Sequence, residues 1–300
     1  MSATTKSRFL HLPATPLSMA LIGLLVLMYG PLLWHWVDGW LSKSISIQHE
    51  YFSHGLLGLP FAAYLAWTQR PKWHELSDHS HPAGWGLLGL GTILYLSQLP
   101  DWMNFSFPLI LAGLCLSLKG LPGLKLLAFP LVLVIFATPS QLPYLIEPYI
   151  LPLQHFIASV AGFLLSQGGM DVTVDQIYLR VNDQMVEVAP HCAGLKILFT
   201  SLYVALILIY WTDLRESRFR TGVFLTATVC LSVIGNIIRN ALLSYFHGTN
   251  NEAAFVWLHE SWGGDVYSAI MLLLLVALVR LIEHYVPENL ALKVDTASKV

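Results

Sequence analysis

Long apolar stretches, separated by short polar segments, dominate this 300-residue chain and restrict how it can fold. Hydrophobic residues make up 55% of the chain and charged residues only 11%, whereas a soluble domain has about 25% charged residues. Backbone groups in lipid must form their hydrogen bonds within the protein, which favours helices. The chain is therefore predicted to be an all-α polytopic membrane protein with about eight transmembrane helices, over 17–37, 54–69, 84–100, 104–118, 121–138, 193–212, 219–246 and 264–285.

The pattern indicates one integral membrane domain over residues 1–300, with short cytoplasmic tails at 1–16 and 286–300. We see no internal repeat, low-complexity tract or soluble domain. The first apolar run follows Lys6 and Arg8, and it has no small-residue cleavage site. It is therefore interpreted as an uncleaved first helix rather than a signal peptide.

Basic residues alternate from one loop to the next, and this sets the predicted orientation in the inner (plasma) membrane. One set of loops and both tails hold nearly all of them, while the alternate loops hold only Lys43 and Arg180. The termini and the basic loops are therefore expected on the cytoplasmic side. The residues of this set are Lys6, Arg8, Arg70, Lys72, Lys119, Lys125, Arg215, Arg218, Arg220, Arg280, Lys293 and Lys299.

The segment 141–167 contains Pro143, Pro148 and Pro152, which interrupt a regular helix. We expect a kinked interfacial helix that lies on the outer face or re-enters the membrane. A full crossing is the alternative, but it would turn the basic loop after 212 outward. Residues 172–188 are rich in β-branched side chains around Asn182-Asp183, which predicts a small extracytoplasmic β-hairpin.

Cys192 lies at the predicted outer start of the helix over 193–212. Free amides and the helix dipole lower the pKa of a thiol at this position, and Lys196 adds positive charge one turn later. Gly194 allows the backbone of a substrate to approach closely. The alternative is an unreactive interfacial cysteine. Cys115 and Cys230 lie inside apolar runs and are expected to be buried.

Arg239 places a charge within the predicted helix over 219–246, where a charge is costly and usually functional or paired. With Ser232, Asn236 and Asn240 it forms a polar stripe at helical spacing. The alternatives are a structural ion pair, for example with Glu187, or a side chain that extends to the interface.

His259 is predicted in an outer loop, on the same side of the membrane as Cys192 and Arg239, where it can act as general acid and base. His191 is the competing base, although adjacent helical residues point to different faces. His259-Glu260 is not a zinc motif, because Gly263 replaces the second histidine. We predict no metal and no cofactor, and the near-zero net charge argues against nucleic acid binding.

At these residues the chain resembles the exosortases and archaeosortases, most closely their cyanobacterial branch, over about residues 50–285. The resemblance rests on Tyr51–Pro60, Tyr64–Trp67, the proline-rich stretch 139–152, Val188–Leu195, Asn236–Arg239 and His259-Glu260. Two positions depart from the usual family pattern. Many members have a small hydroxyl residue in place of Ala193 and an arginine in place of Lys196.

The resemblance implies a membrane cysteine protease-transpeptidase that works through a thioester. Cys192 would be the nucleophile, His259 the acid/base and Arg239 the oxyanion or substrate clamp. Supporting roles fall to Lys196, Asn236, Asn240, Gly194, His191 and Glu260.

The implied partners are exported proteins with a C-terminal tripartite sorting signal: a Pro-Glu-Pro-type motif, a transmembrane helix and a basic tail. Membrane lipids surround the enzyme, and a glycan or lipid is the expected acceptor. Two other functions remain open from the sequence. They are a component of glycan or lipid export, and a noncatalytic scaffold of an exopolysaccharide apparatus.

Overall fold

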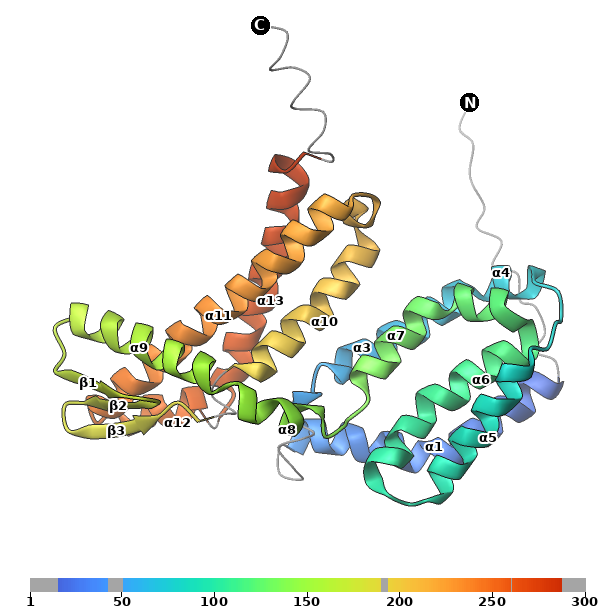
Figure 1. Ribbon diagram of the computed structural model, residues 1–300, viewed down its shortest axis with the longest axis horizontal. Helices are drawn as coiled ribbons and strands as arrows, with labels where there is room; N and C mark the ends of the chain where they lie inside the picture. The colour runs from blue at the N-terminus through green and yellow to red at the C-terminus, as the bar shows by residue number, and fades with distance from the viewer. Residues whose placement is uncertain (1–15, 43–50, 190–193, 260, 288–300) are drawn as a thin grey trace, which may run out of the picture.

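The computed structural model describes residues 16–42, 51–189, 194–259 and 261–287, and most of these residues are helical (Figure 1). The N-terminal half is built from α1 (Pro16–Ser42), α3 (Gly55–Thr68), α4 (Arg70–Glu75), α5 (Pro82–Leu96), α6 (Pro100–Leu126) and α7 (Ala128–Ala137).

A broken segment joins the two halves of the molecule (Figure 1). It consists of the short helix α8 (Leu142–Ile146), the 3-10 turn η1 (Glu147–Tyr149) and α9 (Leu151–Gln167). The C-terminal half then contains strands β1 (Val172–Asp175), β2 (Tyr178–Val181) and β3 (Gln184–Glu187). Its helical elements are α10 (Leu195–Trp211), the 3-10 turn η3 (Asp213–Glu216), α11 (Arg218–Gly248), α12 (Glu252–His259) and α13 (Gly263–Tyr285).

The chain is a membrane protein whose described helices differ in length. Four are long and apolar enough to cross a bilayer: Met19–Ser42 within α1, then α6, α11 and α13. Helices α3, α5, α7 and α10 are apolar but shorter. Helices occur at all eight predicted positions, but length and composition support a complete crossing for four of them. Eight crossings therefore stay a prediction.

The break predicted between the stretches 104–118 and 121–138 is confirmed. The range of α6 contains two helices that meet at a kink at Gly120, which has φ 64° and ψ −156°. Glycine adopts this conformation without a steric penalty, and Pro122 follows it and cannot donate a helical hydrogen bond. A second bend at Leu127, with φ −100° and ψ 11°, separates the end of α6 from the short helix α7.

Buried polar side chains hold α1 against α6. Asn104 accepts a hydrogen bond from Trp36 Nε1 at 2.8 Å and donates one to the carbonyl of Pro139 at 3.1 Å. The hydroxyls of Tyr29 and Ser106 lie 2.9 Å apart. In an apolar environment these groups must be paired, so they define how the two helices align.

Helix α10 packs against the N-terminal half through Tyr203. Its hydroxyl donates to the carbonyl of Leu133 in α7 at 3.0 Å. Its ring lies over Gly58 of α3, where an added Cβ would be 1.9 Å from the hydroxyl oxygen. The ring of His54, the residue just before α3, contacts the Tyr203 ring, with 4.4 Å between ring centroids. These contacts join the two halves of the molecule.

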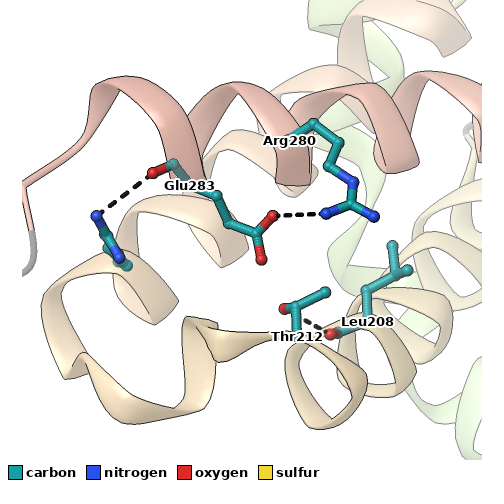
Figure 2. A network of polar contacts seen from close by, with 5 residues as sticks. Leu208, Thr212, Arg280 and Glu283 are labelled. Atoms are coloured by element: carbon teal, nitrogen blue, oxygen red, sulfur yellow. Dashed lines mark hydrogen bonds and ion pairs between the residues drawn. The ribbon is translucent and has the colours of Figure 1, made fainter. Parts of the chain in front are cut away.

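Polar contacts lie within the ends of α10 and α13 and also connect α11 with the end of α13 (Figure 2). Arg280 Nη1 lies 3.2 Å from Glu283 Oε2, and Thr212 Oγ1 donates to the carbonyl of Leu208 at 2.8 Å. Arg220 Nε donates to the carbonyl of Val286 at 2.8 Å. An arginine of the predicted cytoplasmic loop thus satisfies a free carbonyl after the end of α13.

The kink predicted within 141–167 is confirmed by the succession of α8, η1 and α9. Buried Ile157, Ala158 and Ala161 form one core cluster with residues of β2 and α11. The small residue Gly162 allows β1 to approach, since a Cβ there would lie 2.4 Å from Val174 Cγ2. The position of this segment relative to the membrane stays a prediction.

Residues 172–188 form a three-stranded antiparallel sheet in the order β1-β2-β3, so the prediction of a single hairpin was incomplete. The predicted turn at Asn182-Asp183 is confirmed, with φ values of 47° and 69° that are typical of a type I′ turn. A second turn at Gln176, with φ 54°, adds β1. Leu179 and Val181 of the central strand are fully buried in the core cluster shared with α9 and α11.

Only one of the two cysteines predicted to be buried is buried. Cys115 lies inside the N-terminal half, whereas Cys230 is exposed on α11. The prediction for Cys230 is wrong because an apolar neighbourhood in the sequence of a membrane helix does not distinguish the protein core from the outer surface.

Candidate active site

The polar stripe of α11 faces the protein interior. Ser232 is 2% exposed, Asn236 1% and Asn240 3%. Residues four positions apart on a helix lie one above the other, so the three side chains form a continuous row. The Asn240 amide donates to the carbonyl of Asn236 at 2.9 Å. Three members of the predicted stripe thus share one buried face, whereas Arg239, its fourth member, is half-buried.

Asn236 contacts Gly194, the N-cap residue that precedes α10. Gly194 has φ 85°, and a Cβ added there would lie 2.5 Å from Asn236 Cγ. Any other residue at this position would meet both backbone strain and a steric clash. Neither Oδ1 nor Nδ2 of the buried Asn236 amide has a hydrogen-bond partner in the described structure. The amide therefore keeps its hydrogen-bonding capacity beside the start of α10.

The segment that carries Cys192 is anchored at both ends. On one side, Val188 donates to the carbonyl of Ile177 at 2.8 Å and accepts from Gln154 Nε2 at 2.8 Å. On the other, Gly194 packs against Asn236 and accepts the first hydrogen bond of α10 from Leu198 at 2.8 Å. His191 and Cys192 themselves lie outside the described residues.

A pocket of about 220 Å³ opens between β3, α11 and α12. It brings two predicted site residues, Asn240 and His259, to one cavity, although they are remote in the sequence. Its wall combines apolar side chains with groups that can donate or accept hydrogen bonds: Met185, Val186, Glu187, Asn240, Leu243, His247, Phe255 and His259. A mostly apolar cavity with a few convergent polar groups is typical of binding sites in proteins.

His259 is the last residue of α12 and not part of a loop, so its predicted local structure is wrong. The short helix forms because Asn251 caps it: its Oδ1 accepts from the amide of Ala254 at 3.2 Å. Phe255, one turn earlier, stacks on the His259 ring at 5.3 Å and an interplanar angle of 12°. The orientation of His259 is therefore supported by a helix. Glu260 lies outside the described residues.

Arg239 is half-buried and does not belong to the pocket lining. It acts electrostatically on Tyr267 of α13, whose hydroxyl donates to the carbonyl of Gly235. Within the described chain Arg239 forms no ion pair with Glu187. Lys196 is half-buried in the first turn of α10 and also lies outside the pocket lining.

The model of the transmembrane exosortase family matches residues 40–276. The chain belongs to the transmembrane exosortases. The match runs from the end of α1 into α13, so it contains every element of the candidate site. None of the curated proteins and none of the solved structures matches the chain.

Five residues of this exosortase that line the pocket were not singled out by the sequence analysis: Met185, Val186, Leu243, His247 and Phe255. His247 lies one turn after Leu243 on the face of α11 that carries Asn240, and Phe255 precedes His259 by one turn of α12. His247 also contacts Phe255, with 5.3 Å between ring centroids. Continuing the helical spacing beyond Asn240 would have found His247. In the described parts of the chain, no three His, Cys, Asp or Glu side chains are grouped to hold a metal ion.

Proposed function

We propose that this exosortase is a membrane cysteine protease-transpeptidase that cleaves Pro-Glu-Pro-type C-terminal sorting signals of exported proteins. The cleaved protein passes through a thioester to a glycan or lipid acceptor on the extracytoplasmic face. The observation that carries the proposal is the pocket. It places His259 beside Asn240, one turn along α11 from the asparagine that packs against the start of α10.

In the proposed reaction, the Cys192 thiolate adds to the carbonyl carbon of the scissile peptide bond. Arg239 stabilises the negative charge that develops on the carbonyl oxygen. His259 donates a proton to the leaving amine as the C–N bond breaks, which leaves a thioester on Cys192. Water or an amine of the acceptor then attacks the thioester while His259 takes up its proton, and Cys192 is released as a thiolate.

The surroundings of each residue support its role. Val188 and Gly194 are anchored on either side of the segment that carries Cys192, which favours a defined position for a nucleophile. The imidazole of His259 stacks on Phe255 at the wall of the cavity. Arg239 forms no hydrogen bond or ion pair within the described chain, so its guanidinium retains donors for an oxyanion.

The first test is processing of an exported reporter that carries a Pro-Glu-Pro-type signal. We expect cleavage with the wild-type enzyme and none with Cys192→Ala, with equal amounts of both proteins in the membrane. Cleavage is followed by the size of the reporter on immunoblots. Equal cleavage by both chains would reject Cys192 as the nucleophile and favour a component of glycan or lipid export.

The same reporter tests Arg239. Arg239→Ala should lower the cleavage rate by about 10²–10³-fold, the usual effect of losing one oxyanion donor. Arg239→Lys keeps the positive charge but loses the planar guanidinium with its several N–H donors. Its cleavage rate should therefore lie between those of Arg239→Ala and the wild type. Wild-type rates in Arg239→Ala would remove this residue from the reaction.

Comparison of His259→Ala with His191→Ala decides which histidine is the base. We expect His259→Ala to abolish cleavage and His191→Ala to retain it. The opposite result would assign the acid/base role to His191.

A further inference from the structure

One edge of the sheet has unused backbone hydrogen-bonding groups. Within the described residues, β3 pairs with β2 and with no other strand. Val188 donates to Ile177 of the neighbouring strand, and Val181 and Gln184 pair across the two-residue turn. Hydrogen-bonded and non-hydrogen-bonded pairs alternate in an antiparallel ladder. Val186 and its partner Leu179 in β2 are therefore also a hydrogen-bonded pair. The N–H and C=O groups of Met185 and Glu187 must then point away from the sheet.

The pocket lies along this free edge. Met185, Val186 and Glu187 are consecutive, and all three line it. Successive side chains of a strand point to opposite faces, so a cavity that touches three in a row runs beside the backbone rather than over one face. His259 and Asn240 line the same cavity.

We propose that an extended segment of the exported substrate pairs with the free edge of β3 as a fourth strand and places one side chain in the pocket beside His259. This proposal rests on the proposed function and adds how the substrate is held. Only an extended peptide presents N–H and C=O groups at the spacing of the β3 edge. A helix satisfies its own backbone groups, and a lipid chain would leave those of Met185 and Glu187 without partners.

The geometry also explains how a proline-rich segment could be accepted. Proline has no N–H and is compatible with a strand only where the missing donor faces away from the neighbouring strand. In a Pro-Glu-Pro run the two prolines are two residues apart, so both face away when the central glutamate pairs. Because facing carboxylates repel, that glutamate should lie opposite Met185 rather than Glu187.

Disulfide trapping tests the pairing in the full-length membrane protein. The enzyme carries Cys192→Ala to prevent turnover, and Met185→Cys is introduced at the edge. Single cysteines are moved through the reporter segment that precedes its transmembrane helix. We expect the strongest disulfide at the one reporter position that lies opposite Met185. Adjacent positions should give none, because their side chains point to the other face of the strand. Thermal unfolding of the detergent-solubilised Met185→Cys chain at the wild-type temperature checks that this variant folds.

The matched control is Thr173→Cys. Thr173, Arg180 and Met185 are cross-strand neighbours in one row of the sheet, so Thr173 shares the exposed face but occupies the opposite edge. An incoming strand opposite Met185 would lie about 5 Å from it and about 15 Å from Thr173. Since a disulfide requires Cα atoms within about 7 Å, Thr173→Cys should give no product above the level of the Cys192→Ala parent.

Three results would overturn the pairing. They are equal trapping at both edges, equal trapping at adjacent reporter positions, and no trapping at Met185→Cys although the wild-type chain cleaves the reporter and the Met185→Cys chain is folded. A homodimer of Met185→Cys chains that forms equally well with and without reporter would assign the edge to a second copy of the enzyme. If the wild-type chain itself cleaves no reporter, the proposed function fails, independently of these outcomes.

Discussion

At Asn236 the structure keeps a polar group where an apolar one would be more stable. A buried amide without hydrogen bonds costs about 1–3 kcal/mol, and both polar atoms of this side chain lack partners in the described structure. Proteins retain such groups mainly at functional sites, where stability is traded for activity. The Asn236 side chain contacts Gly194 just before α10, next to the segment where the reaction is proposed.

We predict that Asn236→Leu keeps or raises thermal stability but abolishes processing of the reporter. Leucine has the same branching as asparagine and removes the unsatisfied amide. Thermal unfolding of the detergent-solubilised protein and reporter cleavage would be measured together. Asn240→Leu is the control: its amide donates to Asn236 at 2.9 Å, so this variant should unfold at lower temperature. Wild-type processing by Asn236→Leu would exclude a role for the amide in the reaction.

Single residues were predicted well where the signal was local. The spacing of Ser232, Asn236 and Asn240 was enough to place them on one face of a helix. The contact between Gly194 and Asn236 could not be predicted, because it joins residues far apart in the sequence and depends on how α10 and α11 pack. The roles of Cys192, Arg239 and His259 stay predictions.

Among the helices, the packing of α3 on α10 depends on the absence of one side chain. A Cβ on Gly58 would lie 1.9 Å from the Tyr203 hydroxyl oxygen. This ring cannot move aside easily, since Tyr203 is 3% exposed and its hydroxyl is bound to Leu133. Small residues allow close helix contacts in membranes in the same way.

Gly58→Ala should therefore destabilise the protein by about 1–3 kcal/mol, the usual cost of overpacking, even though alanine favours a helix more than glycine does. Thermal unfolding in detergent measures the effect as a lower midpoint. Gly222→Ala in α11 is the matched control, because nothing lies within 4 Å of an added Cβ there. This control should unfold at or above the wild-type temperature. A stable Gly58→Ala protein would contradict the packing of α3 against α10.

Helices were predicted best where the apolar stretch was long. The helices at the eight stretches and the turn at Asn182-Asp183 follow from pattern and turn chemistry. Helix α12 was missed because eight residues carry little periodic signal, although the Asn251 cap was visible in the sequence. Strand β1 was missed because its turn at Gln176 lacks the usual glycine or asparagine.

At the scale of the whole molecule, the sheet and the basic loop between α10 and α11 should lie on opposite sides of the membrane. The alternation of basic loops carries this prediction, and helix lengths alone do not decide it. Asp183 in the β2–β3 turn and Glu216 in η3 are both exposed and report on the two sides.

We expect Asp183→Cys to react with a membrane-impermeant maleimide on intact cells, and Glu216→Cys to react only after the membrane is permeabilised. The unsubstituted chain gives the background from its native cysteines, of which Cys230 is exposed. Labelling of Glu216→Cys on intact cells would mean that the segment 141–167 crosses the membrane.

The arrangement of the two halves could not be derived from the sequence. Hydropathy locates helices, but it does not reveal that Tyr203 of α10 reaches into the contact between α3 and α7. The sequence located the break at Gly120, but only the packed structure distinguishes a kink there from a loop.

The sheet occupies one uninterrupted block of sequence between α9 and α10, whereas Asn240 and His259 lie on later helices. If the sheet holds the substrate as proposed, a change of preferred substrate requires no change in the residues proposed to perform the reaction. Exosortases could diversify by exchanging this short block while the helices that carry the chemistry stay constant. Transplanting residues 172–187 from another member should carry that member's preference with it.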